Sequence, residues 1–459
     1  MLQFPIFPIT YASFCIFSCA CHLSTDPDKA NQDSYSITHS FGGIDGDSLF
    51  AVYDGHGRFG HDCADFAKRH LPKIQAKSIR AERIRLHKAN MKREEKAKTS
   101  GSPKKKTKGA FNPKLWPMLG RKAYEDACRK SLLECNKAMH KDANVDDTLS
   151  GTTVISASFH DGRLTICNVG DSRAVLGVKL QKESVLASAS ADSDEEKKEI
   201  SEHDAAAERR REELVASINS MDDGGLLALP LSQDQTPYRP DERERVKACG
   251  ARVMTVDQIE GLEPVHEDWG KRSGEDIDEV GDPPRIWRKE EDFPGTAFSR
   301  SLGDIVAKDL GVTAEPEMVS VQISRNDRML ILASDGVFEF LTNQQVVDIC
   351  SGFDDPLEAC RKVVSEAYKQ WLHYELRTDD ITIIVLFLEC DKEASAGDYK
   401  NTVELLSMAG RQGQKPLKNK ATEGVEGDSR RTSGERSNSM YKAMDAEAIT
   451  AAVSAGIEE

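Results

Sequence analysis

The sequence predicts a fold that mixes β-strands with α-helices, and three observations support this. Short apolar runs that end or begin at acidic residues indicate buried strands. Two β-like runs joined by an Asp-Gly pair at 161–162 indicate an antiparallel hairpin. Capped or amphipathic segments between the runs indicate helices. Because four of the strands carry an acid at one end, we expect carboxylates to gather at one rim of a sheet.

The first of these strands, residues 49–53, leads into Asp54. Gly55 and Gly57 let the backbone turn there and bring a carbonyl close to a bound group. The other strands and their acids are residues 164–170 with Asp171, residues 328–334 with Asp335, and residues 381–388 preceded by Asp379 and Asp380. A single Asp-Gly pair is typical of an ordinary turn, so the prediction rests on the four acids together.

Gathered carboxylates predict a cation. Without one, the like charges repel and the pKa values of the carboxyl groups rise. A hard divalent ion removes this repulsion. Ligands that are all oxygen, from carboxylates, one backbone carbonyl and water, suit Mg²⁺ or Mn²⁺ rather than zinc.

Helices are predicted by periodicity and by end signals. Residues 62–70, which follow the Asp54 turn, are helical in pattern, and residues 241–249 form a short helix closed by Gly250. Two capping boxes, Thr342 with Gln345 and Asp355 with Glu358, open two further helices. The apolar faces expected in the core are Tyr124, Cys128, Leu132, Cys135 and Met139 on one helix, and Val363, Ala367 and Trp371 on another. Residues 261–293 are polar and irregular, which is typical of a surface flap.

Length, charge and cysteine content narrow the class of protein. At 459 residues the chain forms one large domain with insertions, or two domains. The net charge of −15 argues against a general nucleic-acid-binding protein. The eleven cysteines include no Cys-x-x-Cys pair, which suits free thiols in a reducing compartment, the cytoplasm and/or the nucleus.

The segment 1–25 is apolar, and its first 21 residues carry no charge. A secretory signal peptide cleaved near residues 18–20 is one interpretation, but the segment has no basic start and is interrupted by Pro5 and Pro8. These interruptions also argue against a stable membrane span. An unusual N-terminus that stays with the protein is the alternative.

Three further segments differ in composition from the rest. Residues 73–108 hold fourteen Lys or Arg and three Glu, which predicts a solvated basic insertion, partly helical. Residues 192–223 hold twelve acids and five Lys or Arg, which predicts a solvated acidic insertion. Residues 392–459 are polar and are expected to form a disordered tail.

Seven short motifs in a fixed order resemble the metal-dependent type 2C protein serine/threonine phosphatases, the PPM family. They are Asn31-Gln32-Asp33, Val52-Tyr53-Asp54-Gly55-His56-Gly57, Ser150-Gly151-Thr152-Thr153, Asn168-Val169-Gly170-Asp171-Ser172-Arg173, Ser299-Arg300-Ser301-Leu302-Gly303-Asp304, Ser334-Asp335-Gly336 and Asp379-Asp380-Ile381-Thr382. The match runs from about residue 28 to residue 388. It implies an α+β fold, a four-layer αββα sandwich of two antiparallel sheets flanked by helices. The catalytic domain would span residues 26–391.

The resemblance also implies site residues. Asp54 would bridge two Mg²⁺ or Mn²⁺ ions, with the Gly55 carbonyl on one of them. Asp335 and Asp379 would complete the ligand set, and Asp33 would hold a coordinated water. Asp171, with Asp335, would hold a weaker third ion, to which Glu339 is a further candidate ligand. A solvated acid at a helix start is the other interpretation of Glu339.

The implied activity is hydrolysis of phosphoserine and phosphothreonine in proteins by a two-metal-activated water. His56 is the candidate acid that protonates the leaving group, and a structural histidine is the alternative. Asp28 stands where many members have a phosphate-gripping arginine, so Lys29 is the candidate phosphate ligand. Gln32 likewise replaces a common glutamate. We expect a monomer that acts on phosphoproteins.

Two other functions are left open by these departures. One is a catalytically weak binding protein that keeps the fold, and the other is a phosphohydrolase that acts on small molecules.

Overall fold

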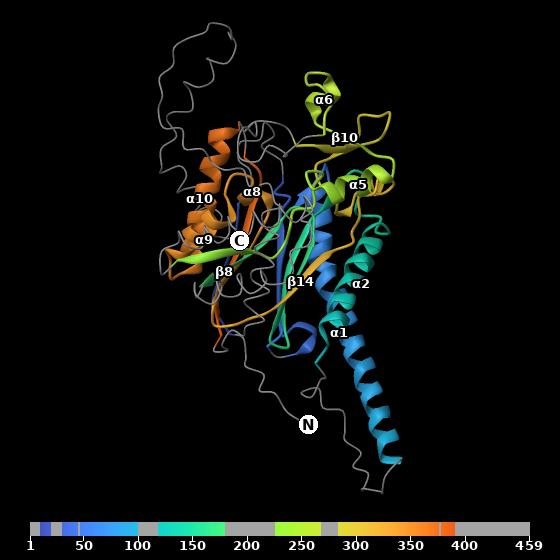
Figure 1. Ribbon diagram of the computed structural model, residues 1–459, viewed down its shortest axis with the longest axis vertical. Helices are drawn as coiled ribbons and strands as arrows, with labels where there is room; N and C mark the ends of the chain where they lie inside the picture. Colours follow the sequence, from blue (N-terminus) through green and yellow to red (C-terminus); the bar gives the residue numbers. More distant parts are fainter. Residues whose placement is uncertain are drawn as a thin grey trace, which may run out of the picture.

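Two five-stranded antiparallel sheets lie face to face between two pairs of helices (Figure 1). The structure is a computed structural model, and it describes residues 10–19, 30–44, 46–99, 118–179, 225–267, 283–375 and 378–390. The first sheet has the order β1 (Thr10–Cys19), β16 (Ile381–Glu389), β15 (Asp327–Ala333), β8 (Arg173–Lys179), β9 (Leu226–Pro230). The second has the order β14 (Glu317–Gln322), β7 (Arg163–Val169), β6 (Val154–His160), β3 (Ser48–Tyr53), β2 (Ser34–His39).

Three apolar layers show that the predicted four-layer αββα sandwich is correct. Between the sheets, Phe50 and Val52 of β3 pack with Leu332 and Ile384 of the other sheet. The opposite face of β3, which includes Leu49, packs against helices α1 (Gly60–Thr99) and α2 (Arg121–Met139). Helices α9 (Asn343–Ser351) and α10 (Pro356–Tyr374) cover the outer face of the first sheet. Because β3 is covered on both faces, its sequence is apolar throughout rather than alternating.

The expected local signals are mostly present. The hairpin between β6 and β7 turns at Asp161 and Gly162, both with positive φ. Thr342 and Gln345 form both bonds of a capping box. At the start of α10 the Asp355 side chain accepts a hydrogen bond from the Leu357 N–H, and Glu358 pairs with Arg361, so Asp355 caps the helix without the predicted box. The predicted apolar face of α2 is buried at all five positions, Tyr124, Cys128, Leu132, Cys135 and Met139.

A further small layer covers one end of the four-layer sandwich (Figure 1). It contains α5 (Pro240–Ala248), β10 (Arg252–Met254), α6 (Val256–Glu260), β11 (Arg285–Trp287), β12 (Pro294–Thr296) and α7 (Ile305–Lys308). The predicted irregular flap at 261–293 therefore includes a strand, and Trp287 of that strand is buried with its Nε1–H donated to the Met254 carbonyl. Three short strands, β4 (Gly55–His56), β5 (Gly151–Thr152) and β13 (Leu302–Gly303), form a separate small sheet. A 3₁₀ turn, η1 (Phe41–Gly43), and a short helix, α8 (Asp335–Phe338), complete the described elements.

The N-terminal segment takes part in the fold. Residues 10–19 form β1, which pairs antiparallel with β16 from Thr10 opposite Glu389 to Cys19 opposite Ile381. β1 therefore covers the edge of β16. Among the described helices, none is both long enough and apolar enough to cross a membrane.

The basic insertion begins as a continuation of α1 rather than as a separate solvated segment. In this stretch Gln75, Ile79 and Arg83 are buried against the domain. The Arg83 guanidinium lies 3.2 Å from an Asp47 carboxylate oxygen and 3.1 Å from one of Asp161. The prediction of a solvated segment was therefore wrong for this part, because the charge of Arg83 is paired inside the protein. Residues 100–108, the acidic insertion and the tail lie outside the described residues.

Arg83→Met should lower the free energy of unfolding by about 3–5 kcal/mol, because it leaves two buried carboxylates without their counter-charge. Burial raises the pKa of Asp47 to about 7, and Arg83 opposes that rise. Removing Arg83 lets this pKa rise further, so the loss should be larger at pH 8 than at pH 5.5, where Asp47 is protonated in both proteins.

Urea unfolding at the two pH values measures this effect. Arg85→Met is the matched control, since Arg85 is exposed and pairs with Glu82 at the surface. It should change stability by less than about 1 kcal/mol. Equal losses in the two variants would contradict the buried role of Arg83.

Candidate metal and phosphate site

Five of the predicted acids lie at one rim of the sandwich. Asp33 precedes β2 and Asp54 follows β3, and these two strands are antiparallel neighbours, so both acids lie at the same end. In the other sheet Asp335 follows β15 and Asp379 precedes β16, which are also antiparallel neighbours. Asp171 lies in the turn that joins β7 of one sheet to β8 of the other.

The charges of these acids act on one another. Burial raises the pKa of Asp54 well above its usual value, and the charges of Asp335, Asp33, Asp379 and Asp171 raise it further. Burial, followed by the charges of Asp379 and Asp171, does the same for Asp335. Burial and the neighbouring Asp234 raise the pKa of Asp171 to about 6. The structure therefore brings together the five carboxylates that the sequence pattern selected.

One buried oxygen at the rim fits a bound cation or its water. Asp33 accepts a hydrogen bond from the Ser334 hydroxyl through Oδ2 at 2.9 Å. Its other oxygen, Oδ1, is buried and has no hydrogen-bond partner among the described residues. An unsatisfied carboxylate oxygen beside further carboxylates is costly unless a cation or an ordered water satisfies it. The available donors, carboxylate oxygens and the Gly55 carbonyl, are all oxygen and suit a hard divalent ion.

Neighbouring groups fix the backbone of the two central acids. Asp54 donates its N–H to the Thr153 hydroxyl at 3.1 Å, and its carbonyl accepts the Thr153 N–H at 2.8 Å. A Cβ on Gly336, the residue after Asp335, would lie 2.1 Å from the Asp380 carbonyl oxygen, so only glycine allows the two acidic loops this approach. The Trp371 indole donates to the Gly336 carbonyl at 2.8 Å and ties this loop to α10.

Gly55 and Glu339 also lie at the rim. A Cβ on Gly55 would lie 2.4 Å from the Gly60 carbonyl oxygen and 2.6 Å from that of Gln32, so no side chain fits there. Glu339, just after α8, lies close enough for its charge to raise the pKa values of Asp171 and Asp335. Lys29, the predicted phosphate ligand, lies outside the described residues.

His56 lies beside the acids and is held by Asp304, a residue to which the sequence assigned no role. His56 Nε2 and Asp304 Oδ2 are 2.7 Å apart, and the same oxygen accepts the Ser301 hydroxyl at 2.6 Å. The Asp304 side chain is only 3% exposed. The Phe298 ring packs on the imidazole, with 4.1 Å between ring centres. The only available signal was that Asp304 ends the Ser299–Asp304 motif, since its partner is 248 residues away.

Asp234 is a second residue that sequence reasoning missed. The Arg173 guanidinium binds both of its oxygens, with Nε at 2.8 Å and Nη2 at 2.6 Å. Its charge is the largest electrostatic influence on Asp171, so it stands at the edge of the candidate site. The available signal was the apolar run 226–231, which ends three residues before Asp234 and forms β9.

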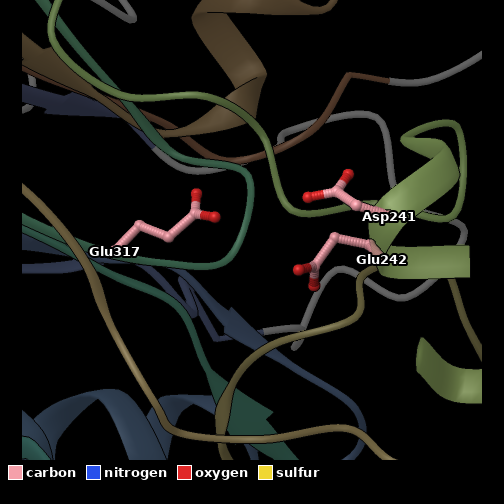
Figure 2. Close-up of side chains that lie close together, drawn as sticks. All are labelled: Asp241, Glu242 and Glu317. Carbon is pink, nitrogen blue, oxygen red and sulfur yellow. The ribbon is translucent and has the colours of Figure 1, made fainter. Parts of the chain in front are cut away.

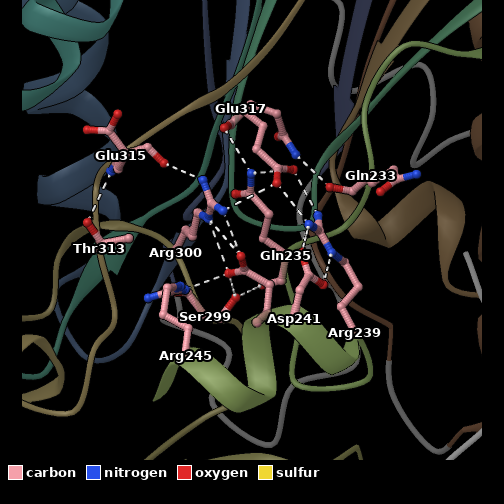
Figure 3. A network of polar contacts seen from close by, with 12 residues as sticks. Gln233, Gln235, Arg239, Asp241, Arg245, Ser299, Arg300, Thr313, Glu315 and Glu317 are labelled. Atoms are coloured by element: carbon pink, nitrogen blue, oxygen red, sulfur yellow. Dashed lines mark hydrogen bonds and ion pairs between the residues drawn. The ribbon is translucent and has the colours of Figure 1, made fainter. Parts of the chain in front are cut away.

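A separate group of acids, Asp241, Glu242 and Glu317, lies between α5 and β14 (Figure 2). Arginines already neutralise it: Arg300 and Arg245 bind Glu242, and Arg239 binds Asp241 and Glu317 (Figure 3). Although burial opposes ionisation of Glu242, Arg300 holds its pKa at about 2. This group is therefore an ion-pair network, and it has no need of a metal.

The network reaches the turn that carries Asp171. Gln235 accepts the Gly170 N–H at 2.7 Å and donates its amide to the Asn168 carbonyl and to Glu317 Oε2, both at 3.2 Å. The Ser299 N–H and hydroxyl both donate to the Gln235 carbonyl (Figure 3). The small layer above the sandwich is thereby bonded directly to the backbone beside Asp171.

Comparison with known proteins gives a consistent set of similarities. The model of the family described as protein phosphatase 2C matches residues 28–221 and 218–373. The chain is 36% identical to "Probable protein phosphatase 2C 35" of Arabidopsis thaliana, over 83% of this chain and 84% of that one. It is 29% identical to "Probable protein phosphatase 2C 48" of Oryza sativa subsp. japonica, over 78% and 80%.

The fold is also similar to that of a solved structure, "Crystal structure of serine-threonine phosphatase 2C from Toxoplasma gondii". The TM-score is 0.53 at 16% identity, and the match covers 84% of this chain and 98% of that one. At this identity the likeness concerns the fold alone.

Proposed function

The chain belongs to the protein phosphatase 2C family, whose members are metal-dependent serine/threonine protein phosphatases, and we propose that its acidic rim is the catalytic centre. The observation that carries the proposal is the convergence of Asp33, Asp54, Asp171, Asp335 and Asp379 at one end of the two sheets. Mutually repelling carboxylates at a solvent-facing rim are the arrangement that two divalent cations would relieve.

We propose Mg²⁺ or Mn²⁺ as the cations. Asp54, Asp335, Asp379 and the Gly55 carbonyl would hold two ions, Asp33 would orient water beside them, and Asp171 with Glu339 would hold a weaker third ion. When bound, the ions supply a nucleophile at neutral pH and offset the charge on the phosphoryl oxygens.

His56 is the proposed donor of the proton to the serine or threonine oxygen that leaves. Its bond to Asp304 and its contact with Phe298 would keep the ring in one orientation while the substrate changes. We keep Lys29 as the proposed phosphate ligand; as an ammonium it would act as a point charge rather than as a two-pronged donor.

We also propose that the protein is a monomer of the cytoplasm and/or the nucleus. Every cysteine whose side chain the structure describes is a free thiol, which suits a reducing compartment. Light scattering of the purified protein would test the monomer.

Turnover assays with purified protein test the proposed function. A phosphoserine peptide, a phosphothreonine peptide and small phosphate esters should be compared with added Mg²⁺ or Mn²⁺ and with a chelator. Metal-dependent hydrolysis of both peptides is the expected result. Activity on small esters alone would favour a small-molecule phosphohydrolase, and no turnover of any substrate would favour a binding protein that keeps the fold.

A further inference from the structure

Two large apolar side chains are exposed beside the His56 loop. Leu149 is 52% exposed and Ile305 is 41% exposed. Their segments are joined by backbone hydrogen bonds. Ile305 N–H donates to the Asp147 carbonyl at 3.0 Å, and the Val306 N–H donates to the Thr148 carbonyl at 3.2 Å. Burying an apolar side chain is favourable, so two exposed apolar side chains on hydrogen-bonded segments offer a surface that a ligand can cover.

These two segments are also the ones that hold His56. Gly151, two residues after Leu149, lies in β5 and pairs with His56 of β4. A Cβ on Gly57 would lie 2.4 Å from the Leu149 carbonyl oxygen, so the loop after His56 lies directly against Leu149. Ile305 follows Asp304, the partner of His56. Leu149 and Ile305 therefore lie on the two chain segments that flank His56.

A cation stands at the same edge. Arg58, two residues after His56, is exposed, and its guanidinium carbon lies 5.4 Å from the centre of the Phe59 ring. The Phe59 N–H donates to the Ser150 hydroxyl at 3.0 Å, which fixes this loop to the segment of Leu149. Arg58 is an exposed positive charge at this edge of the site, so an acidic side chain of a ligand would be attracted there.

We propose that Leu149, Ile305 and Arg58 form a subsite for the part of a phosphoprotein substrate next to the phosphorylated residue. An apolar side chain of the substrate would cover Leu149 and Ile305, and an acidic side chain would pair with Arg58. The inference rests on the proposed function, which places the phosphate between the acids and His56. An extended substrate chain advances by about 3.5 Å per residue. On the His56 side of the site, the substrate residues next to the phosphorylated one would therefore lie over Leu149, Ile305 and Arg58.

Matched phosphopeptides test the subsite. One peptide carries leucine next to phosphothreonine and another carries serine there; a second pair carries glutamate or lysine one position further. The ratio of kcat/KM within each pair is the readout, because it cancels any change in the amount of active enzyme. The wild type should favour leucine and glutamate by about threefold to thirtyfold, the scale of covering one side chain or pairing one exposed charge.

The variants assign this preference to residues. Leu149→Ser and Ile305→Ser should each reduce the leucine preference, and Arg58→Ala should reduce the glutamate preference only. Leu262→Ser is the matched control, because Leu262 is 73% exposed in the loop after α6 and belongs to no part of the site. Its two ratios should equal those of the wild type.

The possible failures can be told apart. Ratios near one in the wild type, or unchanged ratios in the three subsite variants, would overturn the subsite while metal-dependent turnover continues. Absence of turnover of an aryl phosphate and of all four peptides would instead overturn the proposed function on which the subsite rests.

Discussion

Asp54→Asn should reduce turnover of every phosphorylated substrate by more than about 10³-fold. Asp54 is the carboxylate on which the charges of four other acids act, and its loss would remove a charged ligand of the proposed cations. The charge stabilisation that bound metals supply is worth several kcal/mol, and each 1.36 kcal/mol corresponds to a factor of ten in rate. Asp335→Asn should have an effect of the same order.

A second readout of the same variant does not depend on activity. In the metal-free protein, burial and the repulsion of the neighbouring acids raise the pKa of Asp54 well above its usual value, so a negative charge there is destabilising. Asp54→Asn removes that repulsion, so the metal-free variant should melt at the same temperature as the metal-free wild type or higher. Added Mg²⁺ or Mn²⁺ at 100 times its Kd should stabilise the wild type by about 2.7 kcal/mol. In the variant most of this stabilisation should disappear.

Asp241→Asn is the matched control, since Asp241 is an exposed acid that is bonded to Arg239 in the ion-pair network. It should keep both activity and the metal-induced shift in melting temperature. If chelator left the wild type fully active, or if Asp54→Asn still responded to metal as the wild type does, the proposed metal ligands would be wrong.

His56→Gln should lower kcat for phosphoserine peptides by about 10²-fold or more, the usual contribution of a general acid. An alkoxide is a poor leaving group and needs a proton, whereas the phenolate of an aryl phosphate leaves with little help. The loss on an aryl phosphate should therefore be much smaller than the loss on the peptide. The measurement is kcat for both substrates with saturating metal.

Asp304→Asn separates a catalytic from a structural role of His56. Asparagine keeps the size of the side chain but removes the charge that holds the imidazole. We expect a smaller loss with the same dependence on the leaving group. Equal losses on peptide and aryl phosphate in both variants would show that the pair only supports the loop.

The sequence was sufficient to locate the carboxylates because strand geometry determines their positions. An apolar run that ends in an acid places that acid at the end of a strand. In antiparallel neighbours such as β15 and β16, the acid that follows one strand lies beside the acid that precedes the other. The apolar faces of α2 and α10 followed from helical periodicity for the same reason. These are local patterns, which a sequence displays directly.

The missed features depend on partners far away in the chain. Arg83 looks like one more cation in a basic run, and only the fold shows that it is enclosed by Asp47 and Asp161. Asp304 and Asp234 likewise owe their places to His56 and Arg173. The pairing of β1 with β16 joins segments from opposite ends of the described chain. No local pattern reports such pairings, since they form only when the sheets and helices assemble.

The length of α1 has a consequence for how this domain can vary. Its first residue, Gly60, is packed so closely against Gly55 that neither residue can carry a side chain. From there its 40 residues extend over about 60 Å. Among the side chains that the structure describes in this helix, Leu86 is the last apolar one packed against the main core, and Met91 is 53% exposed. Growth by whole helical turns at the far end would change the outline and charge of the molecule without disturbing the loop at its near end. The far end of this rod can therefore change in length and charge while the proposed site at its base stays the same.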